Sequence, residues 1–224
     1  AILAGMLLPA LNKAREMAGG TACKSNQKQL GLWLQSYQDD YSDYLLKSFG
    51  VFPDPPEYPD TKFNWSPWHE YLLYRNARTI FKQKNVTKSI LYCPSDKAAD
   101  ARKWTYYHTK MWTSYGYNCF LGKGEKTPSL PSSTGGIDKR LLKFSILRGT
   151  SPAKILVTGD EWKYKWYHDA TAMTTLLLEE KKLSAGKSDS GTTNYAAHSD
   201  GMNVLWGDGH VAGLKDQNYP LVQW

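Results

Sequence analysis

The first 46 residues form one long stretch with two kinds of hydrophobic pattern. Between Ala1 and Leu11 the residues are almost all apolar, and none is charged. Further along, apolar residues recur at spacings of three and four, which places them on one face of a helix. The residues of this repeating face are Leu30, Trp33, Leu34, Tyr37, Tyr41, Tyr44 and Leu45. The pattern predicts a helical stem, residues 1–46, whose later half packs against a sheet in the rest of the chain.

The start of the stem contains almost no polar residues before Lys13. We therefore expect lipid or neighbouring copies of the chain to cover this apolar surface. The residues of this expected assembly surface are Leu3, Met6, Leu7, Leu11 and Ala14. The uncharged run is too short to cross a bilayer, which needs about 20 apolar residues. Because the run begins without a start-like sequence, we expect about ten more apolar residues upstream and a single-span membrane protein. The alternative is an ordinary N-terminal helix buried in a globular core.

Three residues of the stem favour an interruption of the helix. Pro9 lacks the backbone N–H that a helix interior uses. Gly19 and Gly20 each cost about 1 kcal/mol relative to alanine in a helix. We therefore expect a kink or a weak point at these positions.

Residues 47–224 are expected to form one globular head with mixed secondary structure. Ser66 is the expected N-cap, and Pro67 the first residue, of a second helix that ends near Lys84. Strand-like runs follow at residues 104–108, 114–121, 154–159, 195–198, 202–206 and 210–214. Asp-Gly pairs separate the last three runs, and such pairs are a strong hairpin signal. We therefore predict an α+β fold that ends in an antiparallel meander.

Several segments together resemble a known protein family. They are AILAGMLLPALNKAREMA, CKSNQKQLGLWLQSYQDDYSDYL, Tyr92-Cys93-Pro94-Ser95-Asp96, Ser114-Tyr115-Gly116-Tyr117-Asn118 and an H-x-x-G-x-N-V-L-x-x-D-G-H-V ending at residues 198–211. They resemble the type IV pilin-like proteins, especially the pseudopilins of type II secretion systems. In that family a prepilin peptidase cleaves and methylates a segment with a conserved glutamate, and this segment does not occur in the present sequence.

The resemblance implies a fold, a function and a location. The implied fold is pilin-like, with a long N-terminal helix packed on an antiparallel sheet. The implied function is that of a non-enzymatic structural subunit, anchored by its N-terminal helix and assembled by helix packing. Its implied partners are other pilin or pseudopilin subunits, the inner membrane and secreted proteins. The implied location is the bacterial inner membrane, with one span and with the head in the periplasm or on the cell surface.

The ending also contains residue types that bind metal ions, namely His198, Asp200, Asp208 and His210. Asp and Gly also shape tight turns, and we favour this simpler role over a metal site. Because some pseudopilins hold calcium in a C-terminal loop, the resemblance keeps a structural calcium ion as a minor alternative. No catalytic signature such as H-E-x-x-H or G-x-S-x-G occurs, so we expect no enzyme.

The chain has three cysteines, Cys23, Cys93 and Cys119. In an envelope compartment two of them are expected to pair. The resemblance favours a Cys23–Cys93 bridge, which would fasten the stem to the head. Two alternatives stay open: Cys119 pairs with Cys93, or all three are reduced and buried. We expect no metal on the cysteines, because no C-x-x-C pair occurs.

Charge and aromatic content suggest two further kinds of partner. The net charge of +7 and the pI near 9.1 could attract nucleic acid, but no nucleic-acid-binding motif accompanies them, so this partner is unlikely. The run around Trp162, Tyr164 and Trp166 alternates aromatic and charged residues. Exposed aromatic rings stack on sugars, which makes a surface-anchored carbohydrate-binding or other ligand-binding module the alternative function.

Overall fold

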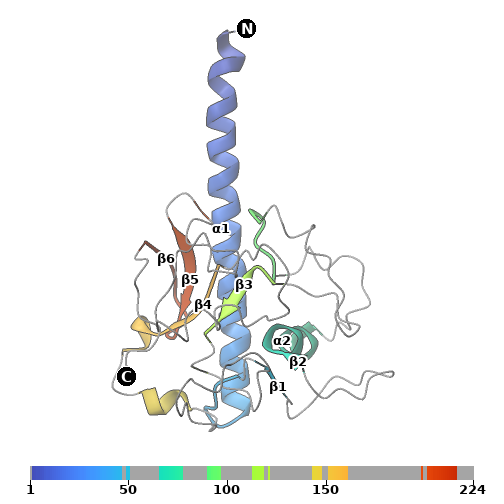
Figure 1. Cartoon of the computed structure of the whole chain (residues 1–224), viewed down its shortest axis with the longest axis vertical. Helices are drawn as coiled ribbons and strands as arrows, with labels where there is room; N and C mark the ends of the chain where they lie inside the picture. Colours follow the sequence, from blue (N-terminus) through green and yellow to red (C-terminus); the bar gives the residue numbers. More distant parts are fainter. Residues whose placement is uncertain are drawn as a thin grey trace, which may run out of the picture.

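The computed structural model describes residues 2–46, 49–50, 66–77, 90–96, 113–118, 121, 143–147, 151–160, 198 and 201–215. Their elements, in chain order, are α1 (Ile2–Asp40), β1 (Phe49–Gly50), β2 (Ser66–Pro67), α2 (Trp68–Ala77), β3 (Tyr115–Tyr117), the 3-10 helices η2 (Phe144–Leu147) and η3 (Pro152–Lys154), β4 (Leu156–Asp160), β5 (Met202–Trp206) and β6 (Val211–Leu214). Figure 1 shows α1 as one long helix whose N-terminal part projects away from the strands.

The main sheet has four strands in the order β3-β4-β5-β6, and each neighbouring pair is antiparallel. All residues of β3, β4 and β5 are buried. Strands β1 and β2 form a separate antiparallel pair. A long N-terminal helix and a four-stranded antiparallel sheet confirm the α+β class predicted from the sequence.

The later half of α1 lies against the sheet, mainly against β5 (Figure 1). A Cβ atom at Gly31 would lie 2.9 Å from Leu205 Cδ1, so the helix backbone comes close to the strand at this glycine. Along this half, Leu30, Leu34 and Tyr37 are buried in the core, while Trp33 and Tyr41 are partly buried against it. The three-and-four spacing of the sequence therefore matches the face that meets the head.

Helix α1 continues through Pro9 and both glycines, so these residues do not interrupt it. At Gly19 a Cβ atom would clash with Ser95 Oγ, and at Gly20 it would lie 3.5 Å from His198 Nδ1. The head thus packs against the helix at both glycines, and at Gly19 the approach leaves no room for a larger residue, which accounts for its place in the helix despite its low helix propensity. The helix ends after Asp40.

The second helix differs from its prediction at its start. Ser66 and Pro67 form strand β2 and pair with β1, so α2 begins only at Trp68. Proline fits this position because it supports extended backbone as well as a first helical turn. Helix α2 ends at Ala77, and the remainder of the predicted helix, up to Lys84, lies outside the described residues.

Helix α2 adds an aromatic layer to the core. Trp68, Tyr71 and Leu72 are buried. The Trp68 ring lies 5.4 Å from the ring of Tyr117 on β3, and the Tyr71 ring meets Tyr37 of α1 edge-on at 6.0 Å. The core therefore lies between α1, α2 and the sheet, and both leucine and aromatic side chains fill it.

Both predicted Asp-Gly turns are formed by glycines with positive φ. Between β5 and β6, the N–H of Gly209 donates to the carbonyl of Trp206 at 2.8 Å, which closes a four-residue β-turn. Before β5, His198 and Gly201 exchange backbone hydrogen bonds of 3.0 and 2.9 Å. The predicted strands at 202–206 and 210–214 are confirmed, the second from residue 211, whereas the runs at 104–108 and 195–197 lie outside the described residues.

Candidate functional site

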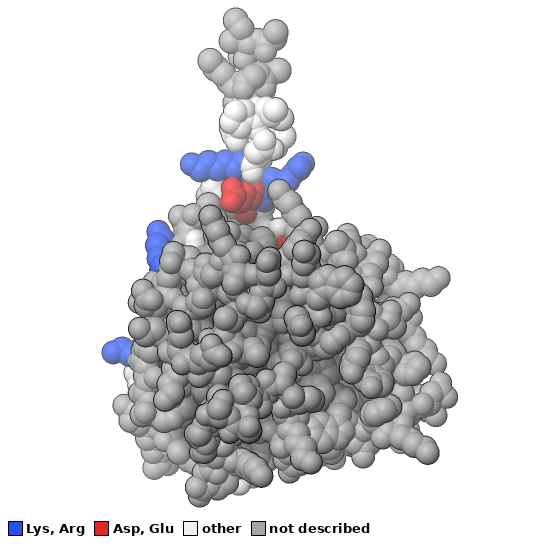
Figure 2. All heavy atoms as spheres, viewed as in Figure 1, with Lys and Arg blue, Asp and Glu red and all other residues white. Residues whose placement is uncertain are grey.

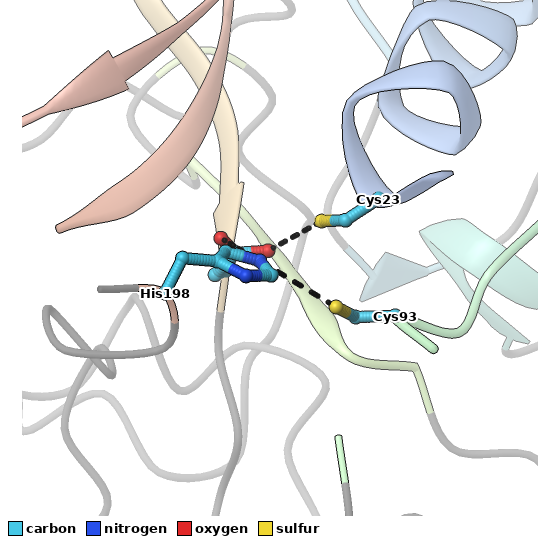
Figure 3. Close-up of side chains that lie close together, drawn as sticks. Cys23, Cys93 and His198 are labelled. Carbon is cyan, nitrogen blue, oxygen red and sulfur yellow. Dashed lines mark hydrogen bonds and ion pairs between the residues drawn. The ribbon is translucent and has the colours of Figure 1, made fainter. Parts of the chain in front are cut away.

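Four side chains from four separate segments meet beside α1. Cys23 comes from α1, Cys93 from the turn at residues 90–96, Asp160 from the end of β4, and His198 from the bridge before β5. Their sulfur, oxygen and nitrogen atoms all lie within 4.8 Å of one another. Figure 3 shows the two cysteines reaching in on one side and the His198 ring on the other. We call these four residues the Cys-Asp-His cluster.

Asp160 is the centre of the hydrogen bonding within the cluster. The Cys23 thiol donates to Asp160 Oδ1 at 3.1 Å. His198 Nε2 lies 3.3 Å from Asp160 Oδ2 and 3.6 Å from Cys93 Sγ. Asp160 and both cysteines are buried, and the His198 side chain is only 10% exposed. A carboxylate, an imidazole and two thiols therefore share one largely water-free space.

A second set of polar groups holds the cluster in place. The backbone N–H of Asn203 donates to Asp160 Oδ2 at 2.6 Å. Gln27 Nε2 lies within hydrogen-bond distance of both Asp160 Oδ1, at 3.2 Å, and the carbonyl of Asn203, at 3.1 Å. The Tyr115 hydroxyl donates to Cys23 Sγ at 3.5 Å. Because each contact comes from a different element, the position of the cluster depends on α1, β3, β4 and β5 together.

The turn that carries Cys93 is tied to both α1 and β3. Asn26 of α1 donates to the carbonyl of Tyr92 at 2.8 Å. Asp96 closes the turn through a 2.9 Å hydrogen bond from its N–H to the carbonyl of Cys93. Ser114, just before β3, donates to the carboxylate of Asp96 at 2.6 Å. The Tyr92-Cys93-Pro94-Ser95-Asp96 motif thus presents the Cys93 thiol at a defined place beside the helix.

Proximity changes the acid–base behaviour of the cluster. Burial alone would lower the pKa of His198, but the hydrogen bond to Asp160 and its charge outweigh burial and raise the pKa to about 9. The pKa of the Cys23 thiol is raised by its interaction with Cys93, by burial and by the nearby Asp160. In this arrangement Cys23 is a protonated thiol at neutral pH, which makes it a poor nucleophile.

The cysteines do not form the predicted bridge. Cys23 and Cys93 are both free and buried in the structure, although they lie in the same cluster. Cys119, the partner of Cys93 in one of the two alternatives, lies outside the described residues. The polar neighbours Asp160 and His198 occupy the space beside the two thiols and hydrogen-bond to them.

The metal-binding residue types singled out from the sequence do not assemble as one group. His198 belongs to the Cys-Asp-His cluster, whereas Asp208 and His210 pair with each other in the exposed turn between β5 and β6, with His210 Nδ1 2.5 Å from Asp208 Oδ1. Desolvation alone would raise the pKa of Asp208, but hydrogen bonds from His210 outweigh it and lower this pKa. Asp200 lies outside the described residues. For Asp208 the turn role favoured from the sequence therefore fits its hydrogen bonds.

The sequence pattern missed the cluster because its members are far apart along the chain. Our expectation that the cysteines hold no metal rested on the absence of a C-x-x-C pair, yet the four residues could hold a metal ion. One local signal was present. Gln27 stands four residues after Cys23 and three before Leu30, on the buried face of the stem, where a polar side chain needs a buried partner.

A second feature of functional interest is the part of α1 before Gly19, which we call the projecting half. Its large apolar side chains are exposed, with Leu7 at 66%, Leu8 at 62%, Leu11 at 58% and Met17 at 64%. Ala14 is exposed as well, whereas the side chains of Leu3 and Met6 lie outside the described set. Among the helices described, none is long and apolar enough to cross a membrane.

The aromatic residues proposed for sugar stacking, Trp162, Tyr164 and Trp166, lie outside the described residues. Many aromatic side chains that are described lie in the core, including Trp68, Tyr115 and Tyr117.

Comparison with protein-family models, with curated proteins and with solved structures gives no significant match to this chain.

Proposed function

We propose that this chain is a non-enzymatic structural subunit of a pilin-like fibre, of the kind that type II secretion systems and type IV pili assemble. In this proposal α1 anchors the subunit in the bacterial inner membrane and packs against the same helix of neighbouring subunits. The head lies in the periplasm or on the cell surface, where it contacts other subunits or secreted proteins. The observation that carries the proposal is the division of α1 into a half packed on the head and an apolar half exposed beyond it.

The energetics of the exposed half favour association. Burying a large apolar side chain contributes about 1.5–3 kcal/mol, and Leu7, Leu8, Leu11 and Met17 are all available. Soluble proteins rarely leave so many neighbouring apolar side chains uncovered, and such surfaces mark protein or membrane contacts. The half of α1 that packs on the head holds the projecting half in a fixed direction. Binding of a partner therefore costs little conformational entropy.

Charge along the helix agrees with this division. Figure 2 shows charged side chains around α1 between the projecting tip and the head. The sequence there contains Lys13, Arg15 and Glu16. Long basic side chains suit a boundary between apolar and aqueous surroundings, because their stems cover apolar surface while their charged ends stay in water. The proposal places the apolar environment on the tip side of this boundary.

The test compares two kinds of exposed apolar residue on the same helix. The triple variant Leu7→Ser, Leu11→Ser, Met17→Ser removes apolar side chains from the projecting half. Leu32→Ser is the matched control, because Leu32 is 58% exposed, as Leu11 is, but stands on the half that packs on the head. Sedimentation velocity without detergent, over a series of protein concentrations, measures self-association of each chain.

We expect the unchanged chain and Leu32→Ser to self-associate and the triple variant to sediment as a monomer. Circular dichroism confirms that all three are folded. Equal association of the triple variant and the unchanged chain would rule out the proposed role of the projecting half. A chain that remains monomeric at every concentration, and does not bind vesicles of bacterial lipid, would also contradict the proposal.

A further inference from the structure

The Cys-Asp-His cluster offers two sulfurs, one imidazole nitrogen and one carboxylate oxygen. Calcium and magnesium take oxygen ligands, so this donor set does not suit them. Zinc binds Cys sulfur, His nitrogen and Asp oxygen, and in structural sites it is almost always bound by four protein ligands in a tetrahedron. The chemistry of the donors therefore selects zinc rather than the calcium considered from the sequence.

The spacing of the donors fits the same metal. Zinc–ligand distances of about 2.0–2.3 Å place the corners of a tetrahedron about 3.3–3.8 Å apart. The structure has 3.1 Å from Cys23 Sγ to Asp160 Oδ1, 3.3 Å from His198 Nε2 to Asp160 Oδ2, and 3.6 Å from His198 Nε2 to Cys93 Sγ. These distances involve both oxygens of Asp160, and all four donor atoms lie within 4.8 Å of one another. Shifts of about 1 Å or less therefore give the spacing that a zinc ion needs.

The surroundings supply the outer contacts that metal ligands require. When one oxygen of Asp160 binds the ion, the other keeps a hydrogen bond from Gln27 or from the N–H of Asn203. The Tyr115 hydroxyl points its proton at Cys23 Sγ, a contact that stabilises a thiolate. These groups already hold two of the four donors in place.

We propose that Cys23, Cys93, Asp160 and His198 form a closed tetrahedral zinc site that locks helix α1 to the head. The ion joins the helix, the turn at residues 90–96, the end of β4 and the segment before β5. Gly19 favours this meeting, since a Cβ atom there would clash with Ser95 Oγ in the turn that carries Cys93. The zinc site is independent of the role proposed for the projecting half of α1.

The first experiment measures zinc in the whole chain, purified with a non-thiol reductant and without chelator. We expect about one zinc ion per chain by mass spectrometry of the metal content. Removal of the ion should lower the Tm, and adding zinc back should restore it. Cobalt(II) added to the metal-free chain should give the visible absorption of a tetrahedral site with thiolate ligands.

Variants then test the ligands individually. Cys93→Ser and His198→Gln should each lose the bound zinc. His210→Gln is the matched control, because His210 also pairs with an aspartate but stands in an exposed turn, and it should keep the zinc. Gln27→Leu changes a positioning residue and should weaken zinc affinity about 10- to 100-fold without abolishing it.

Two results obtained with the unchanged chain would overturn the proposal, and neither depends on a variant that could fail to fold. One is a reduced, folded, unchanged chain that neither carries zinc nor takes up zinc or cobalt. The other is a disulfide between Cys23 and Cys93, found by peptide mass spectrometry in protein prepared without reductant, together with no zinc uptake after reduction. Zinc loss in His210→Gln equal to that in His198→Gln would also contradict the assignment.

Discussion

The two halves of helix α1 have the same backbone and opposite surroundings. From Cys23 onward, one face of the helix is buried at every third or fourth residue, and its side chains are part of the core. Before Gly19, the residues with described side chains are all exposed, including large apolar ones. Helix propensity cannot account for the difference, because both halves are helical and both are rich in apolar residues. The presence or absence of the sheet decides which apolar residues become core.

The largest expected effect comes from replacing one leucine on each half of α1 by alanine. Leu30 is fully buried and Leu11 is 58% exposed. We expect Leu30→Ala to lower the free energy of unfolding by about 2–5 kcal/mol, because it leaves a cavity. Leu11→Ala should change it by about 0.5 kcal/mol or less in the monomer. Denaturant unfolding in dilute solution measures both, and similar losses would contradict the division of the helix.

Alkaline pH should weaken the packed half selectively. Burial, with the neighbouring Tyr41, raises the pKa of Tyr37 from 10.0 to about 12. A pKa raised in the folded state means that folding favours the neutral phenol. The stabilisation is therefore complete below pH 10, is lost as the pH rises towards 12, and amounts to about 1–3 kcal/mol.

Thermal unfolding between pH 9 and pH 12 checks this expectation. The Tyr37→Phe variant should show a shallower loss of stability over that range, because phenylalanine cannot ionise. Some dependence should remain, since burial also raises the pKa of Tyr115. An unchanged slope in Tyr37→Phe would show that Tyr37 does not contribute to it.

The smallest expected change in stability concerns the ion pair and the cation–π contacts between α1 and α2. Arg75 of α2 pairs with Asp40 and lies over the rings of Tyr37 and Tyr41, at 5.5 and 5.3 Å. We expect Arg75→Ala to cost about 1 kcal/mol, because the ion pair is partly exposed and the cation–π contacts are modest. Arg15→Ala, on the projecting half, is the control and should be neutral. Urea unfolding measures both variants.

Local patterns in the sequence predicted much of the framework. The spacing of Leu30, Leu34 and Tyr37 indicated the buried face of the stem, and Asp208-Gly209 indicated the hairpin between β5 and β6. These predictions succeed because helix periodicity and turn chemistry act between residues close together in the chain. Ser66 and Pro67 were assigned wrongly, because pairing with β1 outweighed a helix-start signal that is purely local.

The sequence by itself determined that a long helix would carry one buried face and one apolar end. It also determined that the last strand-like runs would form an antiparallel sheet. The family resemblance had placed Cys23 beside Cys93, but only the tertiary structure decided that Asp160 and His198 join them. Each of these residues stands in a segment whose local pattern says nothing of the other three. Their meeting depends on how α1 packs on the sheet and on the close approach at Gly19, which are properties of packing between distant segments.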